Sequence, residues 1–174
     1  MPNWVKTEII LTGDKNQIHN LLEKCYSLDE ETNEKNFFDF NGVIPMPNHI
    51  FRGNLGVEEM AKYGEDNWYD WSIENWGTKW NACEASVLYR KDGVIVTFNT
   101  AWNFPLPIIK AIKEQYPDIG IYAAWADEDL GNNCGIYNNG EITYEDDLSV
   151  EPFNFACDVW GYDINEMREE YGIS

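Results

Sequence analysis

The residues best suited to chemistry gather in one tryptophan-rich segment, residues 68–81. It holds four tryptophans around a single lysine, Lys79. Large rings in a concave site can stack on a flat ligand, and a lysine among them can neutralise an anion. The segment therefore suggests a small-ligand or nucleotide-binding domain, which could be an enzyme. The candidate ligand-binding residues are Trp76, Gly77, Thr78, Lys79, Trp80, Asn81 and Trp102.

A structural role is the alternative for the same segment. The aromatic face of a helix would then seal a sheet, and Lys79 would bond loop carbonyls or an acid. The tripeptide Gly77-Thr78-Lys79 is no P-loop, because that motif needs a longer glycine-rich spacing directly after a strand. Here the tripeptide follows a predicted helix, so the pattern excludes Walker-type chemistry.

Carboxylates dominate the C-terminal third of the chain. Residues 118–174 hold 14 acidic residues and one base, Arg168, whereas residues 1–117 hold 17 acidic residues and 11 bases. The whole chain has a net charge of −19. Such a surface repels nucleic acid and anionic membranes and attracts basic partners. The candidate partner-binding residues are Asp127, Glu128, Asp129, Glu145, Asp146 and Asp147.

Two other roles for these carboxylates stay open. They can simply keep an aromatic-rich protein soluble, or hold a hard cation if their loops meet. The triplets lack the alternating spacing and the glycine of an EF-hand loop. The two histidines, His19 and His49, are 30 positions apart, whereas zinc needs about four converging ligands. We therefore predict no metal site and no cofactor.

Nucleophilic catalysis has little support in the sequence. There is no G-x-S-x-G motif, and Cys25, Cys83, Cys134 and Cys157 are widely spaced with no histidine beside them. Cysteines in or near apolar runs, without a C-x-x-C pair, are typical of reduced core thiols. We predict no catalytic residue and favour a protein without enzymatic activity.

Length and hydropathy bound the class of protein. A chain of 174 residues suits a single domain, which we place over 1–174 with 145–174 as an acidic C-terminal helical extension. The start, Met1-Pro2-Asn3-Trp4, lacks the basic residues and apolar run of a signal peptide. No apolar stretch approaches the roughly 18 residues of a membrane span. We expect a cytoplasmic protein.

The elements that must position these residues follow from apolar periodicity. Asp92-Gly93 and Asn138-Asn139-Gly140 predict two hairpins, with Asp-Gly supplying the positive φ angles of a tight turn. In the second strand of the first hairpin, alternation should place Val94, Val96, Phe98, Thr100 and Trp102 on the same side. Strands are expected at 7–12, 37–41, 85–90, 94–102, 119–126, 135–137 and 141–144, and helices at 14–25, 66–76, 105–117 and 151–171, the last broken near Gly161.

This order of elements predicts an α+β fold. Two βα units can place their strands in one sheet beside the hairpins, as in a ferredoxin-like split βαβ sheet with helices on one face. The sheet would carry an insertion at about 48–80 and the C-terminal helical extension.

Four motifs resemble the YubB-like (Api92-like) family. They are the opening Met-Pro-Asn-Trp, the Phe-Asn-Gly-Val-Ile-Pro-Met-Pro stretch at 40–47, the block at 68–81, and Thr100-Ala101-Trp102. The resemblance covers roughly residues 1–140, so the acidic tail lies beyond the shared pattern. It implies a ferredoxin-like domain encoded by a plasmid, phage or prophage, and no activity is established for the family.

Together these features favour a non-enzymatic binding protein of a mobile genetic element. It would act on a basic host or defence protein through its acidic surface, as a counter-defence inhibitor or nucleic-acid mimic in the host cytoplasm. The alternative is ligand binding at Trp76–Asn81. A third hypothesis is a structural subunit that pairs with a copy of itself, since the sequence leaves the oligomeric state open.

Overall fold

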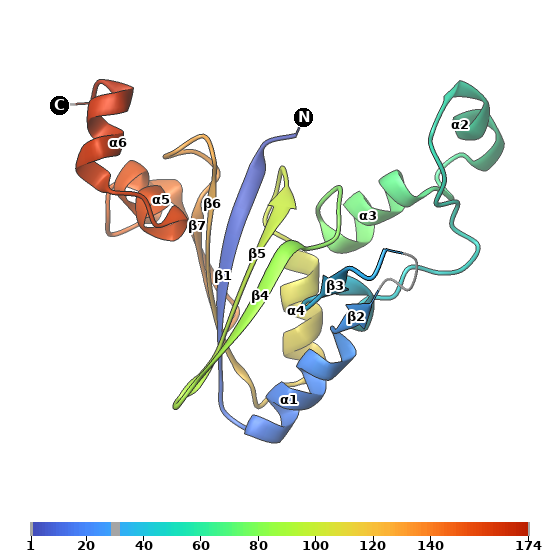
Figure 1. Ribbon diagram of the computed structural model, residues 1–174, viewed down its shortest axis with the longest axis horizontal. Helices are drawn as coiled ribbons and strands as arrows, with labels where there is room; N and C mark the ends of the chain where they lie inside the picture. The colour runs from blue at the N-terminus through green and yellow to red at the C-terminus, as the bar shows by residue number, and fades with distance from the viewer. Residues whose placement is uncertain (1, 29–31, 174) are drawn as a thin grey trace.

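The computed structural model describes residues 2–28 and 32–173. Its centre is an antiparallel sheet of six strands in the order β4-β5-β1-β6-β7-β8 (Figure 1). These strands are β1 (Trp4–Thr12), β4 (Cys83–Arg90), β5 (Gly93–Ala101), β6 (Gly120–Asp127), β7 (Gly135–Asn138) and β8 (Glu141–Tyr144). Two short strands, β2 (Ser27–Leu28) and β3 (Lys35–Asn36), pair separately.

The topology confirms the ferredoxin-like fold. Helix α1 (Lys15–Lys24) follows β1, and helix α4 (Leu106–Gln115) joins β5 to β6. Strand β5 lies between β1 and β4, and β1 lies between β5 and β6. Each βα unit is thus split by a strand of the other. Strands β7 and β8 extend the sheet beyond β6.

One face of the sheet carries the main core. Burial alternates along β1 and β5, so every second side chain faces α1 and α4, which lie on the same side of the sheet (Figure 1). The Asp14 side chain caps α1 by accepting a hydrogen bond from the Gln17 N–H at 2.8 Å. The apolar helix faces that fill this core are Ile18, Leu21 and Leu22 from α1 and Ile108, Ile109 and Ile112 from α4.

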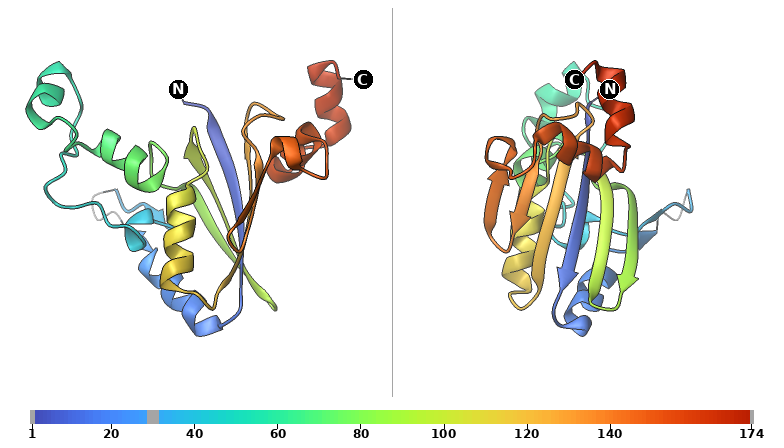
Figure 2. Two further views of the ribbon diagram at one scale, coloured as in Figure 1. Left: turned by 180° about the vertical axis from the view of Figure 1, so that it is seen from behind. Right: turned by 90° about the vertical axis from the view of Figure 1, so that its left-hand side faces the viewer.

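The C-terminal extension covers part of the opposite face. Helices α5 (Pro152–Trp160) and α6 (Ile164–Tyr171) lie in front of the sheet in the right-hand view of Figure 2, with α4 behind it. The Trp160 indole N–H lies 3.0 Å from the carbonyl oxygen of Asp127, and the Lys6 Nζ donates to the Trp160 carbonyl at 3.2 Å. A second core cluster beneath α5 consists of Ala126, Leu130, Cys134, Phe153, Ala156 and Cys157.

The strand predicted at 37–41 is wrong. Strand β3 ends at Asn36, and Phe40–Gly42 form a turn of 3₁₀ helix. Phe38 and Phe40 are buried against Phe98, which produced the alternating pattern in the sequence. The backbone N–H groups of Phe38 and Phe40 instead donate to side-chain oxygens, of Asn36 and Asn81 respectively, so no neighbouring strand is needed.

The insertion contains α2 (Val57–Tyr63) and α3 (Trp68–Trp76), and Figure 1 shows α2 projecting away from the sheet. The Asn67 side chain caps α3 by accepting from the N–H groups of Tyr69 and Asp70, both at 3.0 Å. Helix α3 ends at Gly77, as predicted, in a left-handed conformation with φ 77°. None of the helices in the described residues is long and apolar enough to cross a membrane.

Two glycines that end helices provide a test of this packing. Gly77 and Gly161 have nearly equal φ values, 77° and 76°, but an added Cβ meets Pro107 Cδ at 2.7 Å only at Gly77. Gly161→Ala should lower the free energy of unfolding by about 1 kcal/mol, the strain of a left-handed residue. Gly77→Ala should lower the free energy of unfolding by roughly 1–3 kcal/mol more than that, because the added Cβ overpacks against α4. Urea denaturation measures both values, and equal losses would contradict a close contact between α3 and α4.

Candidate functional site

Part of the tryptophan-rich segment belongs to the core. Trp76 is 4% exposed, and its indole N–H donates to the Ile44 carbonyl at 2.9 Å. The buried Thr78 hydroxyl donates to the Ala101 carbonyl at 2.6 Å, which ties the end of α3 to the end of β5. Gly77 ends the helix. Trp76, Gly77 and Thr78 thus each have a structural role, and Trp76 also borders the cavity described below.

Asn81 also has a structural role. Its side-chain oxygen accepts from the N–H groups of Phe40 at 2.8 Å and Ala82 at 2.9 Å, and its Nδ2 donates to Asp39 at 2.7 Å. Burial opposes ionisation of Asp39, but hydrogen bonds from Asn81, Ser27 and Asn41 hold its pKa below the ordinary value. Asn81 thus fixes the loop at 39–41 against the start of β4.

Lys79 lies inside a cage of aromatic rings. Its Nζ is 4.9 Å from the ring centroid of Trp80, 5.0 Å from that of Trp102 and 5.8 Å from that of Tyr69. Tyr69 and Trp102 themselves meet edge to face at 6.3 Å. Within the described part of the chain, no carboxylate oxygen lies within 4.0 Å of this ammonium group. Cation–π attraction, rather than an acid, holds the charge here.

The prediction that Trp102 continues the alternation of Val94, Val96, Phe98 and Thr100 in the same strand is wrong. The strand ends at Ala101, and Trp102 has φ 73°, a left-handed conformation that costs a bulky residue energy. Its N–H donates to the Asn3 carbonyl at 2.9 Å, and its carbonyl accepts from Asn133 Nδ2 at 2.8 Å. These bonds hold the strained backbone, and the ring meets Lys79 outside the core.

A cavity of about 350 Å³ lies beside this cage. Arg52, from the loop before α2, reaches the same cavity, and its Nη2 donates to the Met46 carbonyl at 2.8 Å. The Trp68 indole N–H donates to the Gly53 carbonyl at 3.0 Å and so holds the loop against α3. The lining consists of Asn41, Met46, Arg52, Trp68, Ser72, Trp76, Lys79, Trp80 and Asn81. The cavity therefore combines two cations with three indole rings.

The two acidic turns emerge from the same end of the sheet. Trp125 of β6 pairs with Gly135 of β7, which in turn pairs with Tyr144 of β8. The turns at 127–129 and 145–147 follow these positions directly, so they lie about two strand spacings, roughly 10 Å, apart. The register of the β6–β7–β8 meander brings together carboxylates that are far apart in sequence.

The six predicted partner-binding residues are not equivalent. Asp127 is 6% exposed, and its carboxylate accepts from Asn3 Nδ2 at 3.2 Å, Asn133 Nδ2 at 3.2 Å and the Asp129 N–H at 2.9 Å. Because these bonds close the turn and bury the carboxylate, we no longer propose Asp127 as a partner-binding residue. Glu145 is half-buried. The exposed carboxylates of the two turns, hereafter the acidic end, are Glu128, Asp129, Asp146 and Asp147.

The acidic end and the aromatic cage are neighbours. The Glu128 carboxylate accepts from the Trp4 N–H at 3.0 Å, and the Trp4 ring lies 5.5 Å from that of Trp80. Asn133 bridges the Asp127 carboxylate and the Trp102 carbonyl. Sequence reasoning missed Tyr69, Arg52 and Asn133. Of these three residues, only Arg52 could have been singled out from the sequence, because it is the one basic residue between Lys35 and Lys62.

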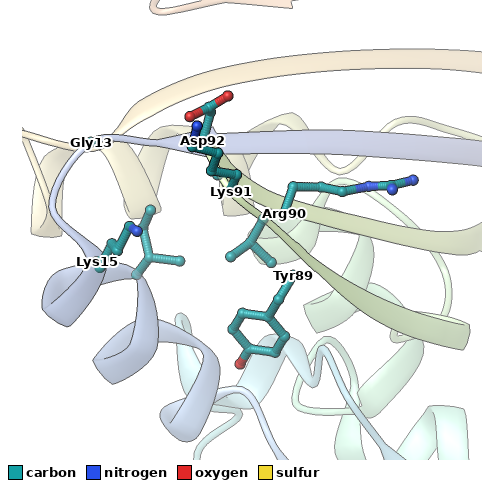
Figure 3. A pocket seen from close by; sticks show the side chains of 9 residues that line it. Gly13, Lys15, Tyr89, Arg90, Lys91 and Asp92 are labelled. Carbon is teal, nitrogen blue, oxygen red and sulfur yellow. The ribbon is translucent and has the colours of Figure 1, made fainter.

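A larger cavity of about 640 Å³ lies at the other end of the sheet, between α1 and the β4–β5 hairpin. Lys15, Arg90 and Lys91 contribute to its lining. Figure 3 shows the Arg90 side chain extending away from α1, on which Lys15 stands. Because these bases diverge, the cavity offers no focused binding point for an anion, and we assign it no ligand.

The cysteines form neither disulfides nor a reactive centre. All four are free, and Cys25, Cys134 and Cys157 are buried. Burial raises the pKa of Cys25 to about 12 and that of Cys134 to about 11, so the nucleophilic thiolate is scarce at neutral pH. Across 2–28 and 32–173, no three His, Cys, Asp or Glu side chains cluster in a way that could hold a metal ion.

Residues 75–173 match a family model described as the ferredoxin-like domain in Api92-like protein. The chain belongs to this Api92-like family. The match confirms the resemblance but corrects its extent, because the acidic tail after residue 140 lies inside the family domain. Searches of curated proteins and of solved structures find no match. Strand β1 lies outside the matched residues although it occupies the middle of the sheet.

The structural role of Asn81 gives a prediction for stability. Asn81→Ala should lower the free energy of unfolding by about 2–3 kcal/mol, because two backbone donors and the Asp39 carboxylate lose their partner. Asn20→Ala, on the exposed side of α1, is the matched control and should change little. Urea denaturation at pH 7 measures both.

The pH dependence of this loss follows from Asp39. Its folded pKa lies below the ordinary value of 3.8, so ionised Asp39 stabilises the fold above that pH, and this contribution disappears as the pH falls through the folded pKa. The difference between the native chain and Asn81→Ala should therefore shrink below about pH 3.8. A constant difference down to pH 2 would contradict an ionic role for this pair.

Proposed function

We propose that this Api92-like protein is a non-enzymatic binding protein whose acidic end engages a basic partner. The observation that carries the proposal is the convergence of the two acidic turns at one end of the sheet. Glu128 and Asp129 follow β6, and Asp146 and Asp147 follow β8, all exposed on short turns held by the sheet. Because the sheet fixes the backbone on which these carboxylates stand, a partner that binds them has less backbone freedom to remove.

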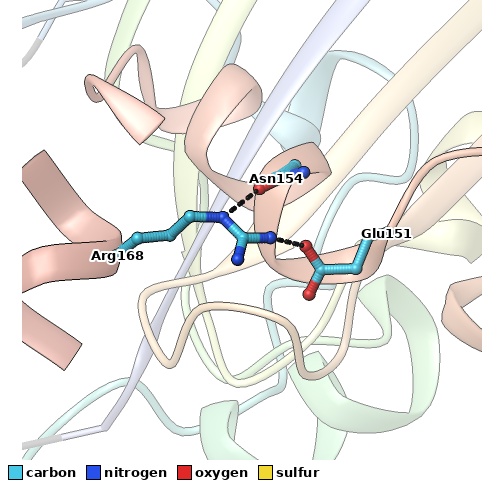
Figure 4. A network of polar contacts seen from close by, with 3 residues as sticks. All are labelled: Glu151, Asn154 and Arg168. Atoms are coloured by element: carbon cyan, nitrogen blue, oxygen red, sulfur yellow. Dashed lines mark hydrogen bonds and ion pairs between the residues drawn. The ribbon is translucent and has the colours of Figure 1, made fainter. Parts of the chain in front are cut away.

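Two bases, Lys6 of β1 and Arg168 of α6, are engaged elsewhere within the protein. Arg168 donates from Nη2 to Glu151 at 2.7 Å and from Nε to Asn154 at 3.2 Å, and so pins α6 to α5 (Figure 4). Lys6 donates to the Trp160 carbonyl, and its Nζ lies 5.7 Å from the Trp160 ring. Neither base pairs with the acidic end, which leaves its carboxylates available to an outside cation.

The partner that fits is a nucleic-acid-handling protein of the host. A groove shaped to hold phosphates also attracts an array of carboxylates, and the net charge of −19 would speed the encounter by electrostatic steering. The protein would then act in the host cytoplasm as a nucleic-acid mimic or counter-defence inhibitor. Direct binding to nucleic acid is disfavoured by the same charge.

Charge neutralisation tests the proposal. The variant Glu128→Gln, Asp129→Asn, Asp146→Asn, Asp147→Asn removes four charges and keeps a side-chain oxygen at each position. The native protein should capture a protein from the heparin-binding fraction of a host lysate, and double-stranded DNA should displace it. With that captured protein purified, the variant should bind about tenfold or more weakly, since each exposed pair contributes roughly 0.2–1 kcal/mol. Biolayer interferometry measures the affinities.

The matched control is Glu58→Gln, Glu65→Gln, Glu74→Gln, Glu114→Gln. These four residues are exposed, lie outside the acidic end and give the same change in net charge. The control should bind as the native protein does. An equal loss in both variants would show that only net charge matters, and a partner that DNA fails to displace would overturn the mimicry.

A further inference from the structure

We propose that the cavity between Arg52 and Lys79 binds a small aromatic phosphate of the size of a nucleoside monophosphate. The cavity lies on the insertion side of the fold and shares none of the carboxylates of the acidic end. The inference therefore goes beyond the proposed function and stands or falls independently of it.

Two cations in one small cavity point to a doubly charged ligand. The chain has 12 bases against 31 acidic residues, yet Arg52 and Lys79 come from different segments to line the same 350 Å³ space. The described residues supply no carboxylate within 4.0 Å of either group. A phosphate monoester carries a charge of about −1.5 to −2 at pH 7, so it matches two cations better than a carboxylate does.

The two cations would hold the phosphate in different ways. Arg52 uses Nη2 to bond the Met46 carbonyl, and its planar guanidinium has further donors for an oxyanion. Lys79 is a point charge whose position is set by the surrounding rings of Tyr69, Trp80 and Trp102. Since those rings cannot neutralise an ammonium ion, an incoming anion would complete its electrostatic environment.

The same cavity offers flat surfaces for a ring. Trp68 and Trp80 both line it and are only half-buried. Each is held in place: the Trp68 indole donates to Gly53, and the Trp80 ring packs against Trp4. A base that stacks on an aromatic side chain gains about 1–3 kcal/mol.

Volume and charge narrow the ligand further. A cavity of about 350 Å³ lies at the lower end of the range for small-molecule sites, which suits one nucleotide rather than a dinucleotide. The net charge of −19 disfavours a long polyanion such as RNA, whose many phosphates would face the acidic surface. A single phosphate senses mainly the two nearby cations, because the Debye length is about 8 Å at physiological ionic strength.

Indole N–H signals in ¹H–¹⁵N NMR spectra give a direct test. We would titrate the full chain with adenosine monophosphate and uridine monophosphate, and separately with adenosine and with inorganic phosphate. At least one nucleotide should shift the Trp68 and Trp80 signals saturably, while those of Trp125 and Trp160, which do not line the cavity, stay in place. Each half of the ligand alone should bind at least tenfold more weakly.

Substitutions at the two cations decide the assignment. Arg52→Gln and Lys79→Met should each weaken nucleotide binding about tenfold, and Lys110→Met, an exposed lysine of α4, should have no effect. Arg52 is exposed, so its variant keeps the test valid even if Lys79→Met unfolds. Saturable binding that needs both cations supports the proposal. No shift at millimolar nucleotide, equal affinity for inorganic phosphate, or an equal loss with Lys110→Met would each overturn it.

Discussion

The pairing of β1 with both β5 and β6 is the constraint on which the rest of the structure depends. Strand β1 pairs with β5 from Trp4 opposite Ala101, and with β6 from Val5 opposite Asp127. This register places the ends of β5 and β6 on either side of residues 3 and 4. Asn3 then bonds both Trp102 and Asp127, so one strand end orders the aromatic cage and the first acidic turn together. Main-chain pairing over the full length of β1 makes this juxtaposition rigid.

Positive and negative side chains occupy separate regions at this end of the molecule, which the net charge of −19 does not reveal. Exposed carboxylates of the acidic end follow β6 and β8. Close to them in space, Lys79 lies among aromatic rings, and Arg52 lines the same small cavity as Lys79. The Trp4 indole lies between the acidic end and the aromatic cage, with its backbone N–H bonded to Glu128 and its ring against Trp80. In the described residues no carboxylate lies within 4.0 Å of the Lys79 ammonium group, which is surrounded by aromatic rings. The two proposed ligands, a basic partner and a small anion, would therefore use different groups on neighbouring surfaces.

The family match shows which residues of this chain correspond to the Api92-like domain. It begins at residue 75, near the end of α3, and runs through α6, so the sheet extension and the C-terminal helices belong to the Api92-like domain. Strand β1 and helix α1 lie before it, yet β1 fills the gap between β5 and β6. Without β1 the matched residues would expose two unpaired strand edges and lose Val5, Ile9 and Leu11 from the main core. The fold thus requires both parts of the chain.

The amino-acid sequence by itself determined the features that depend on neighbouring residues. Apolar periodicity predicted α1 and α4, Gly77 and Gly161 marked helix ends, and the two turn signals located both hairpins, since these are local effects of backbone geometry. The hairpin at Asp92-Gly93 was predicted correctly, but the reason given, a positive φ angle at the glycine, was wrong. Its φ is not positive, and the glycine is needed because a Cβ would lie 2.4 Å from the Leu11 carbonyl oxygen of β1.

Tertiary structure alone decided the roles of the candidate residues. Trp76 and Trp80 both border the same cavity, yet Trp76 is buried and bonded to the Ile44 carbonyl, whereas Trp80 is only half-buried. Asp127 is adjacent to Glu128, but only Asp127 accepts bonds from Asn3 and Asn133 and is buried. The Phe38 and Phe40 pattern predicted a strand, and distant Asn81 made a turn possible instead. In each case the deciding contact joins residues far apart in the chain, and no local pattern records which partner the fold will bring.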